Sequence, residues 1–303
     1  MIAIAHDRDV DGLACHAILR RYCFSSDRKI RHIFADYTDL CLKVEGIRGS
    51  RGEEIVIADL GFSEPVAGCL PLLKELAKDN EVKWFDHHDW SGVKIPRSIK
   101  LHVDMEHCAA ELVAGNYMPR DDVALKLAAL ARAQDFMEKN NDAWRLYDVI
   151  SAGFDKLHLV KLLAKGVFWN IELETCYRDY QEVKDQGFVY LKEHSKYYRI
   201  GEWMCLMGYS KDELSSTIAS THLLEKKSDF AICTWPNGKM SFRRNNPEID
   251  LKKIAALFKG GGRETAAGGH YEGEVTEEDY LRVFDAIMER ISRSYEELNG
   301  FRS

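Results

Sequence analysis

Acidic and histidine side chains are concentrated directly after three short apolar stretches of the sequence. Residues 2–5 precede His6 and a run of alternating aspartates, residues 54–58 precede Asp59, and residues 82–85 precede an Asp-His-His triplet. Short apolar runs predict buried strands of a parallel sheet. Parallel strands place their carboxyl ends at one edge, where open α/β sheets bind ligands. We therefore expect one cluster there, made of His6, Asp9, Asp11, Asp59, Asp86, His87 and His88.

This expected cluster has the composition of a site for a hard divalent cation. Carboxylates held close together repel one another, and a bound cation is the usual reason for tolerating that repulsion. A donor set with more carboxylates than imidazoles and no thiolate suits Mn²⁺ or Mg²⁺ better than zinc. Two such ions would need a bridging carboxylate, and they would generate a hydroxide and stabilise an in-line phosphoryl displacement.

The first half of the chain alternates between strand-like and helix-like segments, which predicts βαβ units and a mostly parallel sheet. Strands are expected at residues 2–5, 31–35, 54–58, 82–88 and, more weakly, 99–104, with helices at 13–19 and 66–78. From about residue 108 the pattern becomes helical, with segments at 110–113, 123–132, 143–165 and 171–194. The last of these is long and charged, as expected of a connector between domains.

The second half predicts a smaller α/β domain. Two strand-like runs flank an Asn237-Gly238 turn, which is typical of a β-hairpin. The other expected elements are strands at 197–200 and 204–207 and helices at 212–224, 251–258 and 277–298. The predicted organisation is therefore α/β, with a sheet-and-helix metal-binding domain over 1–168, a helical linker over 169–196 and a substrate-binding domain over 197–303.

The order of these motifs resembles that of the DHH phosphoesterases. His6 with Asp9-Val10-Asp11-Gly12, Asp59 after its strand, and Asp86-His87-His88 resemble the first three motifs of that family. The segment at 260–269, Gly-Gly-Gly-Arg-Glu-Thr-Ala-Ala-Gly-Gly, resembles the glycine-rich signature of the DHHA1 domain. The resemblance covers nearly the whole chain. Within the family, the chain is similar to the short, two-domain members of the oligoribonuclease (nanoRNase) type and the phosphoadenosine-phosphate phosphatase type. RecJ-type exonucleases carry additional domains.

The resemblance implies a centre of two Mn²⁺ ions, with Mg²⁺ as the alternative. His6 and Asp9 would bind one ion, Asp11 and His87 would bind the other, and Asp59 would bridge the two.

Further roles follow from the same resemblance. The family's fourth motif supplies one more acid, for which we prefer Asp135 to Asp104 on motif order. His88 would lie near the scissile phosphate. Asp86 would orient a histidine, as metal-bound imidazoles usually require. The role of Asp7, a third acid in the first motif, stays open.

The resemblance also implies substrate contacts in the C-terminal domain. Many family members have a histidine after the three glycines, where this chain has Arg263. An arginine there can still bind a phosphate bidentately. Glycines next to it favour a close approach of the backbone to an anion. The expected substrate-binding residues are Arg243, Gly260, Gly261, Gly262, Arg263, Gly268, Gly269 and His88.

Composition limits the classes of function. The formal net charge of −7 disfavours broad binding to duplex DNA. We expect a cytoplasmic protein without a membrane segment, because no apolar stretch reaches the length of a span and the start lacks the features of a signal peptide. The eight cysteines are scattered, which predicts reduced, buried thiols rather than disulfides or a structural zinc site.

The sequence thus predicts a Mn²⁺-dependent phosphodiesterase that hydrolyses short single-stranded RNA or DNA to mononucleotides. The enzymatic alternatives are a phosphoadenosine-phosphate phosphatase, a phosphodiesterase of cyclic or linear dinucleotides, and a RecJ-like single-strand exonuclease. The alternative from another class is a silent nucleotide-binding scaffold, which the complete set of expected ligands disfavours. Homodimer formation stays open.

Overall fold

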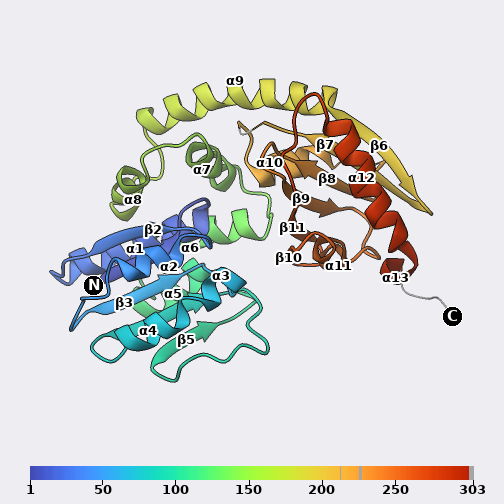
Figure 1. The fold of residues 1–303 in the computed structure, drawn as a ribbon. Helices are drawn as coiled ribbons and strands as arrows, with labels where there is room; N and C mark the ends of the chain where they lie inside the picture. The colour runs from blue at the N-terminus through green and yellow to red at the C-terminus, as the bar shows by residue number, and fades with distance from the viewer. Residues whose placement is uncertain (212, 225–226, 300–303) are drawn as a thin grey trace. The chain divides into compact units, whose positions relative to one another are not determined.

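The computed structural model describes residues 1–211, 213–224 and 227–299 of the 303-residue chain (Figure 1). The chain divides into two compact units, Met1–Arg178 and Asp179–Ser303. This division falls within helix α9, Ile171–Glu193, and so within the segment expected to be the linker.

The first unit is built on a parallel sheet of five strands in the order β2-β1-β3-β4-β5. The strands are β1 Ile2–His6, β2 Arg31–Ala35, β3 Glu54–Ala58, β4 Glu81–Asp86 and β5 Ile99–Val103. In register, Ile4 lies opposite Ile33 on β2 and Ile57 on β3. The strand order reverses between β1 and β3, and such a switch point is where sheets of this kind bind ligands.

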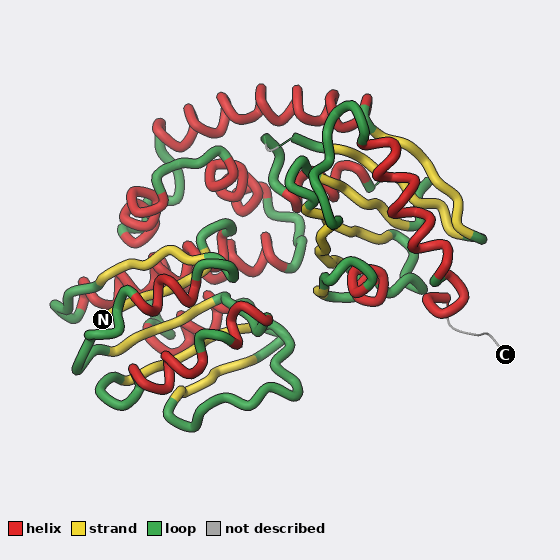
Figure 2. The backbone as a smooth tube through the Cα atoms, in the orientation of Figure 1, coloured by secondary structure: helices red, strands yellow, loops and turns green. Residues whose placement is uncertain are grey.

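Helices cover this sheet, as Figure 2 shows in red beside the yellow strands. One group consists of α1 Val10–Ser25, which packs on α5 Ala109–Tyr117, α6 Asp122–Asp135 and α8 Lys156–Ala164; α7 Asn141–Ser151 lies against α6. A second group consists of α2 Leu40–Glu45, α3 Glu64–Ala67 and α4 Leu70–Leu76. The single helix expected at 66–78 is therefore two helices. Pro71 in the first turn of α4 cannot donate the hydrogen bond that a continuous helix needs.

The two faces of β1 show why the helices pack where they do. Ile2 and Ile4 belong to a core that includes residues of α2 and α4. Successive side chains of a strand point to opposite faces, so Ala3 and Ala5, both fully buried, lie on the other face. Their small side chains allow a helix to pack closely against the strand, next to the turn that carries the first motif.

The second unit contains a mixed sheet of six strands in the order β10-β11-β9-β8-β7-β6. Strands β7 and β8 are parallel, and the other neighbouring pairs are antiparallel. The elements are β6 Ser195–Ile200, β7 Trp203–Tyr209, α10 Ser216–Leu223, β8 Phe230–Thr234, β9 Lys239–Arg244, α11 Leu251–Ala256, β10 Gly261–Gly262, β11 Ala266–His270, α12 Tyr280–Arg293 and α13 Tyr295–Asn299.

Three expectations for the second unit need adjustment. The glycine-rich segment forms strands β10 and β11, which its composition did not indicate. The helix expected at 212–224 begins at Ser216 because Ser215 caps it, and Asp212 lies outside the described residues. The helix expected at 277–298 is divided into α12 and α13 at Ser294.

The expected fold class is confirmed: a parallel sheet flanked by helices, followed by a second unit with its own sheet. None of the helices in the described parts of the chain combines the length and the apolar character needed to cross a bilayer.

The expectation that all cysteines are reduced is wrong at one pair. Cys41 in α2 and Cys69 before α4 form a disulfide, with their Cα atoms 4.9 Å apart. Helices α2, α3 and α4 pack together, which brings two cysteines that are 28 residues apart into contact. The other six cysteines, all within the described residues, form no disulfide.

Candidate metal centre

The turn between β1 and α1 brings His6 and Asp9 together. Asp9 caps α1 by accepting a hydrogen bond of 3.0 Å from the Gly12 backbone N–H. A β-carbon at Gly12 would lie only 2.0 Å from the His6 carbonyl oxygen, so only glycine fits there. This tight turn leaves His6 Nδ1 2.7 Å from Asp9 Oδ2.

Asp59 lies between two imidazoles. Its Oδ2 is 3.5 Å from His6 Nδ1, and its Oδ1 is 3.4 Å from His87 Nε2. The residue has a positive φ of 54°, which is uncommon outside glycine and concentrates at functional sites. Its side chain is buried, and its Oδ2 atom makes no hydrogen bond to any of the described residues. A buried carboxylate oxygen in that state has the lone pairs that a cation needs.

His87 connects Asp59 to two further carboxylates. It is buried, its Nδ1 is 3.4 Å from Asp135 Oδ2, and its Nε2 is 3.8 Å from Asp11 Oδ2. Asp135 is the last residue of α6. Asp104, the alternative fourth acid, has 43% of its side chain exposed and pairs instead with His107 at 2.8 Å. The structure therefore places Asp135 beside His87 and Asp104 outside the cluster, and the identity of the fourth acid stays a prediction.

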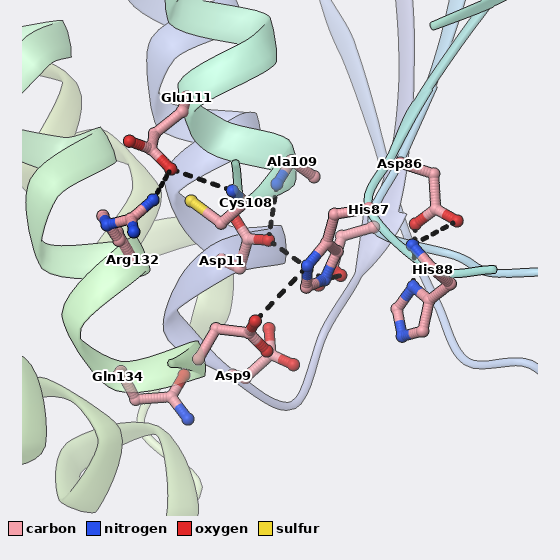
Figure 3. A network of polar contacts seen from close by, with 12 residues as sticks. Asp9, Asp11, Asp86, His87, His88, Cys108, Ala109, Glu111, Arg132 and Gln134 are labelled. Carbon is pink, nitrogen blue, oxygen red and sulfur yellow. Dashed lines mark hydrogen bonds and ion pairs between the residues drawn. The ribbon is translucent and has the colours of Figure 1, made fainter. Parts of the chain in front are cut away.

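Asp11 has a structural role that the sequence did not reveal. Its carboxylate accepts backbone hydrogen bonds from Ala109 at 2.8 Å and Ala110 at 2.7 Å, at the N-terminus of α5 (Figure 3). These contacts fix the buried carboxylate against a helix N-terminus, which stabilises negative charge. Each carboxylate oxygen has a second lone pair, so the contacts leave room for a cation.

Other residues that the sequence interpretation missed support the same turn. Gln134 Oε1 accepts a hydrogen bond of 3.2 Å from the backbone N–H of Val10, between Asp9 and Asp11. Glu111 accepts from the Cys108 backbone at 2.9 Å and from Arg132 at 3.2 Å, which ties α5 to α6 (Figure 3). In the sequence, Gln134 lies at helical spacing from the apolar residues Leu127, Leu130 and Ala131, and a polar residue on such a face is the signal that could have identified it.

Asp86 and His88 form a second polar unit beside the cluster. Asp86 is fully buried, and it accepts hydrogen bonds from His88 Nδ1 at 2.9 Å and from the Trp90 indole. Although burial would raise the pKa of Asp86, its hydrogen bond with His88 lowers it, so the carboxylate stays charged. This geometry supports the expected role of Asp86 in orienting a histidine. Asp7, whose role was open, pairs with Lys156 of α8.

Burial and mutual repulsion shift the acidities within the cluster. Burial, together with the charge of Asp9, raises the pKa of Asp59 to about 8. Burial and the charge of Asp59 likewise raise the pKa of Asp11. Burial opposes charge on Asp9 too, but His6 beside it lowers the pKa of Asp9 to about 2. Burial disfavours charge on His6, whose pKa is nonetheless raised by Asp9 and Asp59. Carboxylates in this state are stabilised by added positive charge.

Two groups of donor atoms in this cluster could each hold a metal ion, and they share Asp59. Two groups of side chains each bring their donor atoms within 4.8 Å of one another, and Asp59 belongs to both. One group is His6, Asp9 and Asp59, and the other is Asp59, Asp86, His87 and His88. Oxygen and imidazole donors without thiolates suit Mn²⁺ or Mg²⁺. The assignment of individual ligands stays a prediction.

Apart from His88, which lies in the first unit, the predicted substrate-binding residues lie in the second unit. Arg243 on β9 is opposite Ala266 on β11, and Arg263 is exposed between β10 and β11. The glycines there differ in what requires them. A β-carbon at Gly260 would lie 2.0 Å from the Gly268 carbonyl oxygen, whereas one at Gly261 would have no neighbour within 4 Å among the described residues. Packing within the protein therefore explains why position 260 is a glycine, but it does not explain why position 261 is one.

The fold is shared with several solved structures, although no protein-family model and no curated protein matches the sequence. An exopolyphosphatase-related protein from Bacteroides fragilis has a TM-score of 0.59 at 15% identity, over 96% of this chain and 92% of that one. The pGpG-specific phosphodiesterase PggH from Vibrio cholerae has a TM-score of 0.57 at 13% identity, over 96% and 99%. RecJ from Thermus thermophilus, in complex with Mn²⁺, has a TM-score of 0.65 at 16% identity, over 96% and 51%.

Identities this low establish a common fold, and that fold is the one expected from the resemblance to the DHH phosphoesterases. The strand-end cluster of the first unit lies at and directly after the carboxyl ends of β1, β3 and β4, and its role as a metal site stays a prediction.

The repulsion between the crowded carboxylates can be tested by measuring the thermal stability of the metal-free protein. Asp59 has a higher pKa in the folded protein, about 8, than the value of 3.8 expected in the unfolded chain. Its ionisation therefore makes the folded protein progressively less stable as the pH rises between these two pKa values. Asp59→Asn should therefore raise the melting temperature of the metal-free protein, and more so at pH 8.5 than at pH 5. Each kcal/mol relieved corresponds to about 2–4 °C in a unit of this size.

Differential scanning fluorimetry in excess chelator would measure this, with Asp104→Asn as the control outside the cluster. A lower melting temperature for metal-free Asp59→Asn at pH 8.5 would contradict the repulsion inferred from the geometry.

Proposed function

We propose that the protein is a DHH-type phosphodiesterase that depends on two divalent cations, Mn²⁺ before Mg²⁺, and hydrolyses short single-stranded oligonucleotides to mononucleotides. The observation that carries the proposal is the position of Asp59. Its two oxygens face two different imidazoles, His6 and His87, and it belongs to both groups of donor atoms. A carboxylate so placed is suited to bridge two ions.

The residues that would hold the ions are those of the strand-end cluster. His6 and Asp9 would bind one ion, Asp11, His87 and Asp135 would bind the other, and Asp59 would bind both. When bound there, a pair of divalent cations supplies the Lewis acidity that polarises a phosphoryl group and lowers the pKa of water.

The protein's own side chains would then orient the substrate. His88 has about a third of its side chain exposed, and Asp86 holds its Nδ1. The exposed part of the imidazole would lie beside the scissile phosphate of the substrate. In the second unit, Arg263 and Arg243 would bind phosphate, and Gly261 would allow a close approach of the substrate, since no neighbour within the described protein requires that glycine.

A panel of substrates tests the proposal. Short RNAs and DNAs, phosphoadenosine phosphate, and cyclic and linear dinucleotides would be incubated with the protein and Mn²⁺, and the products separated by chromatography. Release of mononucleotides from two- to five-residue strands is expected. Release of inorganic phosphate from phosphoadenosine phosphate alone would support the phosphatase alternative. No turnover of any substrate would overturn the proposal.

A linear dinucleotide is the second candidate substrate. The observation that favours it is the fold shared with the pGpG-specific phosphodiesterase PggH over 96% of this chain and 99% of that one. A dinucleotide is also the shortest member of the oligonucleotide series, so one set of substrates distinguishes a strict dinucleotide phosphodiesterase from an enzyme that accepts longer strands.

The hydrolysis rate should fall with substrate length and depend weakly on salt. Each phosphate beyond the first few needs its own cationic partner, and a chain with a net charge of −7 offers few. Few released counterions imply a shallow salt slope, so strands of about two to five nucleotides should react fastest. End-labelled single strands of increasing length, assayed at two salt concentrations with a duplex control, measure this. Faster and more processive cleavage of strands tens of nucleotides long would indicate a RecJ-like enzyme.

A further inference from the structure

Three separate segments of the first unit enclose the imidazole of His88. Asp86 at the end of β4 holds its Nδ1, the Tyr37 hydroxyl lies 3.3 Å from its Nε2, and Gly61 lies against its ring. Tyr37 comes from the loop between β2 and α2, and Gly61 from the segment after Asp59. The three contacts approach the ring from segments far apart in the sequence.

Gly61 is required by this packing. A β-carbon there would lie 2.5 Å from His88 Cγ and 2.8 Å from its Nδ1. Real β-carbons essentially never come so close to a neighbouring atom, so any larger residue at position 61 would displace the ring. The imidazole therefore has little freedom to rotate on that side.

The hydrogen bonds fix which nitrogen of His88 carries its proton. The Asp86 carboxylate can only accept, so Nδ1 donates to it. In the neutral imidazole, Nε2 is then an acceptor, and the Tyr37 hydroxyl is the group that donates to it. The tyrosine ring crosses that of His88 at 84° and lies 5.5 Å from the ring of His6, so it packs between two histidines of the site.

We propose that Tyr37 is a positioning residue: its hydroxyl and ring, together with Gly61, hold the His88 imidazole in one orientation beside the strand-end cluster. This inference rests on the proposed function for the identity of the substrate.

The first test needs no activity. Protein with ¹⁵N-labelled histidine, free of metal, would be examined by long-range ¹H–¹⁵N NMR, with His88 assigned by its loss in His88→Gln. We expect His88 to carry its proton on Nδ1, and Tyr37→Phe to shift the Nε2 resonance while Nδ1 keeps its proton. A proton on Nε2 in the wild-type protein, or an unchanged Nε2 resonance in Tyr37→Phe, would overturn the proposal.

The second test is kinetic, with Mn²⁺ and a dinucleotide. Tyr37→Phe should lower kcat about three- to tenfold, which corresponds to the loss of one neutral hydrogen bond. It should change KM by less than about twofold, because a residue that only positions His88 makes no contact of its own with the substrate. In a His88→Ala background the same substitution should cost nothing further, because Tyr37 acts through His88. The matched control is Tyr117→Phe, which removes a hydroxyl bonded to Glu54 at the opposite end of β3.

A rise in KM with unchanged kcat, or an equal loss in the His88→Ala background, would overturn the positioning role, since either result means that Tyr37 acts independently of His88. If the wild-type protein hydrolyses no substrate, the proposed function fails, and the NMR result still decides whether Tyr37 positions His88.

Discussion

Replacing Asp59 by asparagine is expected to lower the phosphodiesterase rate by on the order of 10²- to 10³-fold, the loss typical of removing one group that stabilises transition-state charge. The physical reason is its position: each of its oxygens faces a different imidazole, so the substitution disturbs both halves of the centre. The substitution also removes the negative charge that would bridge two cations while changing the volume of the side chain very little.

Asp104→Asn is the control for this prediction. Asp104 also follows a strand, but 43% of its side chain is exposed and it pairs with His107 outside the cluster. Its loss should change the rate by no more than about twofold, which corresponds to the ~0.5 kcal/mol usual for substitutions away from such features. Steady-state rates with a dinucleotide at saturating Mn²⁺ measure both variants. Equal losses in the two would show that the ligands have been assigned to the wrong acids.

Removing divalent metal is expected to abolish activity. Cations stabilise transition-state charge by several kcal/mol, which corresponds to a loss on the order of 10³-fold or more in rate. The donor set of carboxylates and imidazoles implies that Mn²⁺ restores activity better than Zn²⁺ or Ca²⁺.

Chelation followed by titration with each ion measures this response, with circular dichroism to show that the metal-free protein stays folded. Full activity in excess chelator would exclude a mechanism that uses metal ions.

The strand-end cluster could be predicted because it follows from local rules. His6, Asp59 and Asp86 each end or follow an apolar run, and parallel strands in register bring those ends to one edge. The β2-β1-β3 order then places His6 and Asp59 at a switch point of the sheet. Predicting that position requires the strand order as well as the pattern of apolar runs. The fold class followed from the same alternation of strands and helices.

The contacts that hold the cluster could not be predicted, because they join segments far apart in the sequence. Gln134 reaches the backbone of Val10 across 124 residues, and Asp11 accepts from the start of a helix almost a hundred residues later. The Cys41–Cys69 disulfide depends on how the helices that carry the two cysteines pack. The spacing of apolar residues within a single helix or strand does not predict such contacts.

The strand formed by residues 266–270 escaped prediction for a different reason. Alanine and glycine dominate that segment, and both have low strand propensity. Pairing with β9, in which Ala267 lies opposite Phe242, supplies the stability that the local sequence lacks. Tertiary context here overrides propensity.

A centre of two cations that share Asp59 should bind two Mn²⁺ ions per chain, so the number of bound ions is the decisive measurement. Metal-free protein would be loaded with Mn²⁺, separated from unbound metal, and analysed by inductively coupled plasma mass spectrometry alongside Asp59→Asn and Asp104→Asn. The account predicts two ions per chain in the wild-type protein and in Asp104→Asn, and fewer than one in Asp59→Asn. Wild-type protein that binds no more than one ion, or Asp59→Asn that still binds two, would contradict it.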